Sequence, residues 1–369
     1  MLPKRKPELD LKNHWRLNRK RSAGFGLIEI MVAMVIGMFG VMVMMQVLSV
    51  SEGQKRSTTG GNDAMNEGAM ALYAIQSDIR MSGYGITDLK LLGCPLKLRT
   101  SPATVQLNTL APVVINSSNI TGNDTNTDTL LAFYGMTNGT PQGDAVNTIT
   151  ASPAGNGVQT PQSFSQNDWV MVAPGTRATP CVTTLNLDQV ATVSSVTAPF
   201  YVTWTVGPPY AATSVAFNQG QSYRAVGYAV RSGNLTTCDF STTDCSGGTN
   251  WTSIADNIVS LRAQYGRDTA AAGSMDGFVD VYDKTAPTTG DTACGWARIS
   301  AIRFVLVARS AQSEKTTVTA TAPVWDGSGT TANNIDLSGD SQWQYSRYKV
   351  FQTTVPMRNV SWMGAVAGC

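Results

Sequence analysis

Histidine is almost absent from this sequence. The 369 residues contain one, His14, and it lies within the first 24 residues. Most acid–base and triad chemistry depends on histidine, because its pKa lies near neutral pH. The sequence also contains neither a G-x-G-x-x-G nor a G-x-x-x-x-G-K-[ST] nucleotide-binding motif. No carboxylate or lysine constellation stands out in their place, so the sequence predicts a protein that is not an enzyme.

Charged residues are scarce as well, at 14% of the chain, and they are unevenly placed. Residues 1–24 hold eight of the 27 basic residues and two of the 25 acidic ones. Residues 25–369 therefore carry 19 basic and 23 acidic side chains, a net charge of −4. A net negative segment without a basic run offers no broad phosphate-binding face, so no nucleic-acid partner is expected.

One long apolar segment dominates what the sequence does contain. From Phe25 to Leu48 it carries a single ionisable side chain, Glu29. About 20 apolar residues cross the ~30 Å hydrocarbon layer of a membrane, so residues 25–50 are predicted to form a transmembrane helix. The basic residues before it favour a cytoplasmic N-terminus. A bare carboxylate in that layer costs at least ~2.5 kcal/mol, so Glu29 needs a partner.

The residues around the start of this segment resemble the prepilin signal of type IV pilins and type II secretion pseudopilins. Gly24 precedes Phe25, and Glu29 is the fifth residue counted from Phe25. The resemblance implies that a prepilin peptidase cleaves after Gly24 and removes the cytoplasmic leader 1–24. It also implies N-methylation of Phe25 and neutralisation of a neighbouring subunit's N-terminal amine by Glu29. The alternative is an ordinary signal anchor with a stray Glu. An ordinary secretory signal would instead have a short apolar core with a small-residue cleavage site after it, whereas here the small residue precedes the apolar run.

Residues 51–85 are predicted to continue the first helix as an amphipathic segment. Residues 51–63 are polar and contain Gly53, Gly60 and Gly61, which mark either a weak point in one helix or a break between two. Residues 64–82 then repeat apolar residues every three or four positions, which predicts a face that a β-sheet covers. The residues of that predicted face are Met65, Ala69, Leu72, Ile75 and Ile79.

The sequence SDIRMSGYG at 77–85 resembles the D-I-R-x-A-G-Y signature of PilW-type minor pilins. Asp78 and Arg80 do not face each other on one helix, so each is expected to reach the following domain or the solvent. The sequence RYKVFQTTVPMRN at 347–359 resembles the C-terminal pattern of the same family.

Residues 86–369 are predicted to form a β-rich periplasmic globular domain, with room for two subdomains. Short β-branched or aromatic runs alternate with loops rich in Gly, Pro, Asn, Ser and Thr. Low-complexity connectors are expected at 135–166 and 233–250, and the alternation of Val226, Tyr228 and Val230 predicts a half-buried strand. The strongest runs are 129–134, 169–173, 201–206, 223–231, 297–309 and 347–359.

All six cysteines follow the apolar segment: Cys94, Cys181, Cys238, Cys245, Cys294 and Cys369. An even number in an exported segment predicts disulfides, although six cysteines allow 15 connectivities. The one local pairing that the spacing favours is Cys238–Cys245, and Cys369 is placed to staple the C-terminus to the body. Zinc is the rival, but there is no C-x-x-C pair and no histidine partner.

Residues 254–283 contain the best candidate for a metal site. PilW-like sequences often have an Asp-rich loop after a Tyr-Gly pair, and here Tyr265-Gly266 is followed by four aspartates. Ca²⁺ prefers several oxygen ligands at close spacing, but TAAAGSM stands where further acids are expected. The alternative is a hairpin turn at Asp276-Gly277 with solvated acids. The four candidate ligands are Asp268, Asp276, Asp280 and Asp283. Beyond this calcium hypothesis, no cofactor is expected.

The resemblance implies a pilin-like α+β fold, in which a long N-terminal helix packs on an antiparallel β-sheet. It implies a minor pilin that co-assembles with other minor pilins and the major pilin, primes type IV pilus assembly and sits at or near the pilus tip. A large PilY-type tip adhesin is a further expected partner. The protein would cross the inner membrane once before it joins the extracellular pilus. The alternatives are a GspJ-like pseudopilin of type II secretion and a tip adhesin or DNA-uptake binding subunit.

Overall fold

The structure is a computed structural model of the chain. It describes residues 24, 26–99, 104–136, 143–151, 154–195, 200–205, 210–288, 292–330, 333–361, 366 and 369. The chain divides into two compact units, Met1–Ser57 and Thr58–Cys369.

Helix α1 (Leu27–Met81) is the longest element and runs without interruption through Gly53, Gly60 and Gly61. The alternative of a break between two helices at residues 51–63 is therefore wrong. Leu27 to Arg56 are all exposed, whereas the later part of α1 buries one stripe. That stripe consists of Gly60, Ala64, Gly68, Ala71, Ile75 and Ile79.

The buried stripe of α1 differs in part from the predicted face. Ile75 and Ile79 are buried as predicted, and Leu72 is half-buried. The placement of Met65 and Ala69 on the buried face is wrong, because both are exposed. The positions that do face the sheets include Gly68, where an added Cβ would lie 2.0 Å from the ring of Phe351. Between Gly60 and Ala71 the strands approach α1 so closely that glycine and alanine fill the contact, and large apolar residues are buried only further on, at Ile75 and Ile79.

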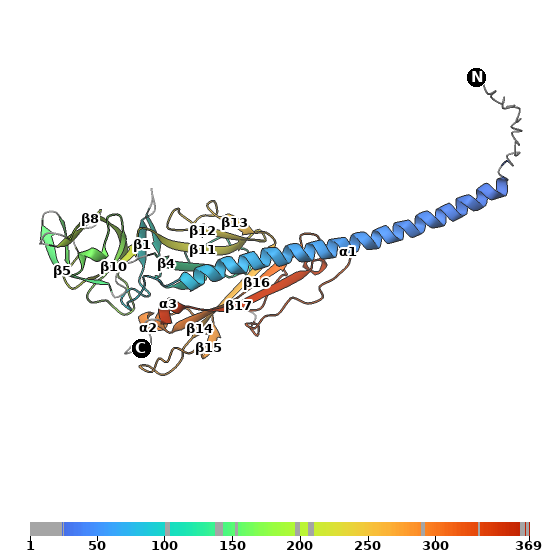
Figure 1. Cartoon of the computed structure of the whole chain (residues 1–369). Coiled ribbons are helices and arrows are strands. Elements are labelled where there is room, and N and C mark those ends of the chain that lie inside the picture. The colour runs from blue at the N-terminus through green and yellow to red at the C-terminus, as the bar shows by residue number, and fades with distance from the viewer. Residues whose placement is uncertain are drawn as a thin grey trace, which may run out of the picture. The chain divides into compact units, whose positions relative to one another are not determined.

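Two sheets pack along residues 58–81 of α1 and enclose the main hydrophobic core with it (Figure 1). The first is antiparallel and has the strand order β13-β12-β11-β4-β3. Its strands are β3 (Val113–Ile115), β4 (Leu130–Gly135), β11 (Tyr223–Arg231), β12 (Asn234–Asp239) and β13 (Thr252–Ala255). Strand β11 is buried on both faces from Ala225 to Val230, so the prediction of a half-buried strand is wrong.

The second sheet is also antiparallel and has the strand order β15-β14-β16-β17. Its strands are β14 (Ile258–Arg267), β15 (Val281–Asp283), β16 (Ile299–Arg309) and β17 (Tyr348–Pro356). Two short helices, α2 (Thr292–Ala297) and α3 (Arg358–Ser361), flank it, and a 3-10 turn, η2 (Trp343–Tyr345), precedes β17. Residues of the segment between β16 and β17, such as Trp325 and Ile335, cover the face opposite α1.

A third, eight-stranded sheet contains a closed barrel. Strands β8, β7, β10, β5, β6 and β9 pair in that order, and β9 pairs back to β8. The strands are β5 (Asp144–Ala151), β6 (Ala154–Val158), β7 (Trp169–Ala173), β8 (Leu185–Ser194), β9 (Tyr201–Trp204) and β10 (Val215–Gly220), with the 3-10 turn η1 (Pro161–Ser163). Strands β1 (Leu96–Arg99) and β2 (Thr104–Leu107) extend the sheet, and β1 lies parallel to β8. The barrel has its own core of valines with Phe164 and Trp204.

The barrel is inserted into a β-hairpin of the first sheet. Strands β4 and β11 pair directly, and Gly135 lies opposite Tyr223. All six barrel strands belong to residues 136–222, which connect these two positions. The prediction of a loop at 135–166 is therefore wrong, because β5, β6 and η1 lie there, and β12 likewise occupies part of 233–250.

The fold class predicted from the sequence is confirmed. A long N-terminal helix packs on antiparallel sheets within a β-rich domain. Each of the strongest predicted runs corresponds to a described strand. The bounds of β7 and β11 match the predicted runs, whereas the ends of β4, β9, β16 and β17 are shifted.

Candidate functional site: helix α1 and its junction with the sheets

The N-terminal part of α1 carries the predicted processing and registration residues. Gly24 is exposed, whereas Phe25 and residues 1–23 lie outside the described residues. Glu29 lies in the first turn of the helix, where its N–H donates to Gly26 O at 2.9 Å. A carboxylate is favoured there because the helix dipole is positive at its N-terminus. Among the described residues, no cationic side chain forms an ion pair with Glu29.

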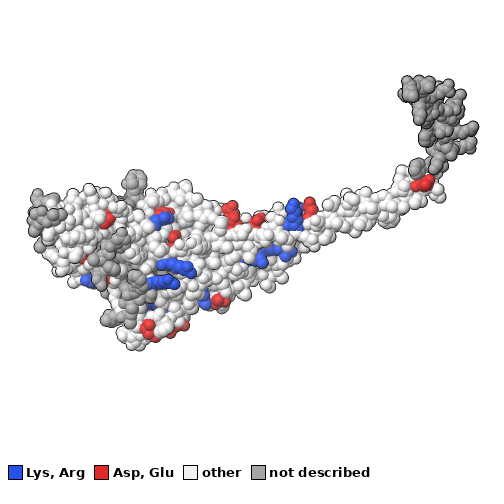
Figure 2. Space-filling model, in the orientation of Figure 1, with Lys and Arg blue, Asp and Glu red and all other residues white. Residues whose placement is uncertain are grey.

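The segment that follows is long and apolar enough to cross a membrane. None of it is buried by the rest of the described chain. Figure 2 shows it as white, with red atoms near its N-terminal end. These properties, together with the N-terminal motif, fit membrane anchoring, since an apolar surface of this length is unfavourable in water.

Asp78, in the predicted signature SDIRMSGYG, joins α1 to the first sheet. The Tyr134 hydroxyl of β4 donates to its Oδ1 at 2.9 Å, and the Tyr228 hydroxyl of β11 donates to its Oδ2 at 2.6 Å. Burial, and then the charge of Asp78, raises the pKa of both tyrosines. Arg80 is exposed. The expectation that these two side chains reach the following domain and the solvent is confirmed.

The turn after α1 explains the glycines of the same signature. Gly83 and Gly85 have φ of +81° and +85°, a left-handed conformation that favours glycine. The Gly83 N–H donates to Phe133 O at 2.9 Å, so the turn that follows α1 is hydrogen-bonded to β4. At Gly85 a Cβ would lie 2.3 Å from Oε1 of Gln219, at the end of β10.

The two segments that resemble PilW-type proteins meet at the C-terminal end of α1. Asn359, in α3, donates through Nδ2 to Met81 O at 3.0 Å and to Ser82 O at 3.1 Å. Met81 is the last residue of the helix and Ser82 follows it, and the carbonyls at a helix C-terminus have no partner within the helix. The sequence 347–359 therefore caps the helix that ends in 77–85.

One stripe of α1 within the second unit stays open to solvent and is partly apolar. Met70, Tyr73, Ser77 and Met81 follow one another at three and four residues, so they share a helix face. Tyr73 is 72% exposed and Met70 57%. Large apolar side chains grouped on one exposed face are typical of a contact surface. We call these four residues the exposed stripe.

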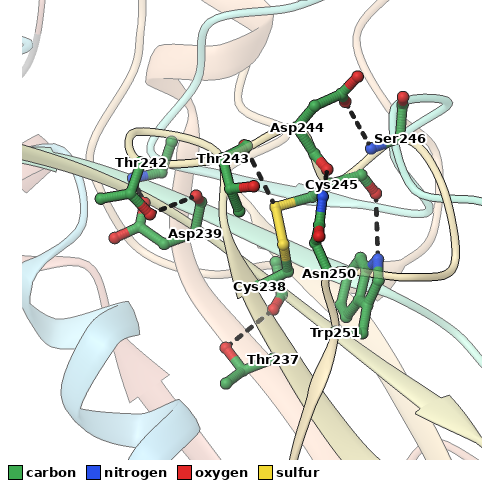
Figure 3. Close-up of a disulfide and its surroundings, with 12 residues drawn as sticks. Thr237, Cys238, Asp239, Thr242, Thr243, Asp244, Cys245, Ser246, Asn250 and Trp251 are labelled. Atoms are coloured by element: carbon green, nitrogen blue, oxygen red, sulfur yellow. Dashed lines mark hydrogen bonds between the residues drawn. A yellow bond between two sulfur atoms is a disulfide. The ribbon is translucent and has the colours of Figure 1, made fainter. Parts of the chain in front are cut away.

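Three disulfides tie the second unit: Cys94–Cys181, Cys238–Cys245 and Cys294–Cys369. The first links the segment after α1 to the barrel. The second closes the loop after β12, where the Trp251 indole N–H donates to Cys245 O at 3.0 Å (Figure 3). The third joins Cys369 to α2.

The four aspartates of the calcium hypothesis do not form one ligand set. Asp268 accepts the N–H groups of Asp276 and Gly277 at 2.8 and 2.9 Å. Burial opposes its ionisation, but these bonds outweigh it and lower the Asp268 pKa. Asp280 accepts the Thr269 N–H. Asp283 pairs with an arginine of β14, Arg267. Within the described ranges, no three His, Cys, Asp or Glu side chains are grouped to hold a metal ion.

Sequence reasoning missed a buried charge cluster between the two sheets. Asp128 is 3% exposed, and Lys284 Nζ lies 2.6 Å from its Oδ2. Burial lowers the Lys284 pKa despite this partner. Arg262 Nη1 of β14 lies 3.7 Å from Oδ1. A buried charge is unfavourable without a partner, so these residues fix the loop before β4 onto β14. Arg262 and Lys284 lie 134 and 156 positions after Asp128, so no local sequence pattern predicts that the three side chains meet.

Comparisons with protein families match two parts of the chain. Residues 19–45 match the prokaryotic N-terminal methylation motif, and residues 230–359 match type IV pilus-assembly protein W. The second match covers β12 to β17 and Asn359, and it excludes the inserted barrel. The resemblance to PilW-type proteins with a prepilin signal is confirmed.

A comparison with curated proteins found no match. Among solved structures, a type IV-like pilin from Thermus thermophilus is similar with 10% sequence identity and a TM-score of 0.31. That alignment covers 80% of this chain and 96% of the other.

Proposed function

We propose that this chain, in which a PilW-type region follows a prepilin N-terminal methylation motif, is a minor pilin of a type IV pilus. It co-assembles with other minor pilins and the major pilin, primes filament assembly and sits at or near the pilus tip. The observation that carries the proposal is α1, whose first 30 residues are all exposed and whose only acidic residue before Glu52 is Glu29.

Such a helix suits a protein that moves from one apolar environment to another. In the inner membrane, lipid covers the segment while the globular domain faces the periplasm. In a filament, the apolar helices of neighbouring subunits cover it instead. Cleavage after Gly24 by a prepilin peptidase would free the Phe25 amine. Glu29 of one subunit would then pair with that amine on its neighbour, which supplies the partner that a carboxylate in an apolar environment needs.

The exposed stripe extends this assembly surface into the globular unit. Tyr73 presents a large amphipathic side chain of the kind enriched at protein interfaces, and Met70 adapts to irregular partner surfaces. Neither side chain is required by the core. A sister subunit, or a large PilY-type tip protein, is the partner we propose for it.

The test is co-purification of the sister minor pilins with variants of the full-length protein from the native host. Glu29→Gln should leave cleavage after Gly24 intact, by mass spectrometry of the N-terminus, and reduce capture of the other minor pilins. Glu52→Gln is the matched control, since Glu52 is the next acidic residue on the same exposed helix. Equal capture by both variants contradicts the role of Glu29.

The same pull-down examines the exposed stripe. Tyr73→Glu should reduce capture, whereas Val324→Glu, at an apolar side chain that is 77% exposed outside α1, should not. Recovery of secretion-system pseudopilins in place of pilus subunits would support the GspJ-like alternative. Normal surface pili in a deletion strain would contradict the priming role.

A further inference from the structure

The inserted barrel has almost no surface charge. Between residues 136 and 222 the sequence contains four charged residues. Three of them, Asp144, Asp168 and Asp188, are at most 6% exposed. The fourth, Arg177, donates to Leu89 O and Leu92 O at 2.6 and 2.7 Å and so fastens the barrel to the main body. Figure 2 shows few blue or red side chains over this part of the molecule.

A cavity of about 520 Å³ lies at the base of the barrel, where the chain enters and leaves the insertion. Hydroxyl and amide side chains make most of its wall, and Asp168 is its one ionisable residue. Polar residues in the cavity wall include Gln162, Ser163, Ser165, Asp168, Asn218 and Gln221. This volume lies within the range of small-molecule sites in proteins.

A β-bulge holds the polar wall in one arrangement. The pairing of β10 with β7 shifts between Asn218 and Gly220, and Gly220 has a φ of +78°. Its N–H donates to Asn218 Oδ1 at 2.7 Å. Asn218 Nδ2 in turn donates to Ser163 O and to Asp168 Oδ2, both at 2.7 Å. β-bulges often re-aim side chains next to binding and active sites. Here three hydrogen bonds fix the orientation of the Asn218 amide.

Only one carboxylate oxygen of Asp168, Oδ2, takes part in this hydrogen-bond network. Its Oδ2 accepts the Ser165 N–H at 2.7 Å as well as the Asn218 amide. No hydrogen bond to Oδ1 occurs among the described residues, although Asp168 is 94% buried from solvent (6% exposed) and lines the cavity. Asp168 Oδ1 is not one of the described buried side-chain atoms that lack a partner, so this oxygen is open to the cavity. The geometry therefore presents an oriented acceptor to whatever occupies the cavity.

We propose that this cavity binds a neutral carbohydrate, so that the inserted barrel recognises a glycan surface. A sugar offers hydroxyl donors for Asp168 Oδ1, and the glutamine amides at 162 and 221 both donate and accept toward its other hydroxyls. A phosphate or nucleic acid would meet a carboxylate and no cation. A divalent metal would find one carboxylate here, and the described residues contain no group of three or more His, Cys, Asp or Glu side chains that could hold a metal ion. This activity goes beyond assembly of the pilus.

The test measures binding of neutral oligosaccharides to the full-length protein by isothermal titration calorimetry. The detergent is lauryldimethylamine oxide, because maltoside detergents carry the sugar class under test. The probes are cellohexaose, maltohexaose, xylohexaose and N-acetylated chitohexaose, with spermidine as a cationic probe. At least one oligosaccharide should bind with one-to-one stoichiometry. Asp168→Asn should weaken it at least about tenfold, because a donor replaces the free acceptor.

A milder pair of variants keeps the test independent of folding. Gln162→Ala should weaken binding several-fold, whereas Gln166→Ala should not, since Gln166 is exposed on the same segment but does not line the cavity. Binding is measured on purified protein, so the result does not depend on pilus assembly. The proposal is overturned if none of the sugars binds, if spermidine alone binds, or if the Gln162 and Gln166 variants behave alike.

Discussion

Replacement of Asp78 by alanine should weaken the attachment of α1 to the first sheet. The change removes the acceptor of two hydrogen bonds, from Tyr134 at 2.9 Å and from Tyr228 at 2.6 Å. Both tyrosines are less than 9% exposed, so their hydroxyl groups would lose the carboxylate where water has little access, and Tyr228 would keep only a 3.5 Å contact with Ala74 O. Hydrogen bonds to a charged group contribute roughly 1.5–3 kcal/mol each. Because Asp78 itself is half-buried, we take the lower limit and expect a loss of about 3 kcal/mol of unfolding free energy.

The assay is urea unfolding of the unit Thr58–Cys369, followed by tryptophan fluorescence. Asp78→Asn should cost only about 1 kcal/mol, since the amide still accepts one hydroxyl and donates to the other. Tyr134→Phe should destabilise the wild-type unit but be nearly neutral in the Asp78→Ala background, because its hydroxyl then has no acceptor left to lose. Tyr228→Phe should likewise lose most of its effect there, since only the long contact of its hydroxyl with Ala74 O, at 3.5 Å, is left. Strictly additive effects in this double-mutant cycle would refute the reasoning.

The same contacts predict how stability depends on pH. Burial, followed by the Asp78 charge, raises the pKa of Tyr134 and Tyr228 in the folded state. The unfolded chain then loses these protons first, near pH 10, while the folded chain keeps them. Their contribution is therefore complete below about pH 10 and falls as the pH rises further. The Tyr→Phe variants should show a shallower loss of unfolding free energy between pH 9 and pH 11.

Three further changes test how the parts of the second unit are joined. Gly68→Ala should lower the free energy of unfolding by about 1–2 kcal/mol, because the new methyl group would lie 2.0 Å from the ring of Phe351. Gly60→Ala meets only an ordinary contact at 3.4 Å and should be neutral or stabilise α1 by up to about 1 kcal/mol; equal effects would contradict the close packing. Asn359→Ala should cost about 1 kcal/mol and speed amide hydrogen exchange in the last turn of α1, without change elsewhere in the helix. Replacement of Cys94 and Cys181 by serine, 87 positions apart, should cost about 4.6 kcal/mol by loop entropy, against about 2.4 kcal/mol for the seven-residue disulfide loop after β12. A smaller loss at the longer loop would contradict that estimate.

The sequence predicts the helical and strand elements well where local pattern decides them. The apolar run, the signature at 77–85 and the C-terminal strand are each visible in a short window of residues. The contact between Asp78 and its two tyrosines is not, because Tyr134 and Tyr228 lie 56 and 150 positions further on. A polar signature at the end of a helix could have suggested a search for hydroxyl donors on the strands, but not which ones.

The barrel escaped prediction for a different reason. The sequence predicts β7 and β9, but β5 and β6 are rich in Thr, Asn, Gly and Ala, so a hydrophobic period of two is faint in them. Such a composition is typical of a polar connector as well as of a small barrel whose outer face is neutral. The apolar contacts that build the barrel core join neighbouring strands, as where Val146 of β5 pairs with Val158 of β6. Such contacts are not visible in the pattern of a single strand. Similarly, the error at Met65 arises because glycine and alanine, rather than large apolar residues, mark the buried face of α1 from Gly60 to Ala71.

The position of the insertion constrains the order in which this protein can fold. Strands β4 and β11 pair directly, although residues 136–222 separate them. Closing a flexible loop of that length costs about 4 kcal/mol of chain entropy before any pairing compensates for it. A barrel that has already formed removes this cost, because the Met136 N–H then lies 2.8 Å from Gln219 O and both ends of the insertion are held together. We therefore expect the barrel to form before β4 pairs with β11, so that the insertion sets the rate at which the first sheet closes around it.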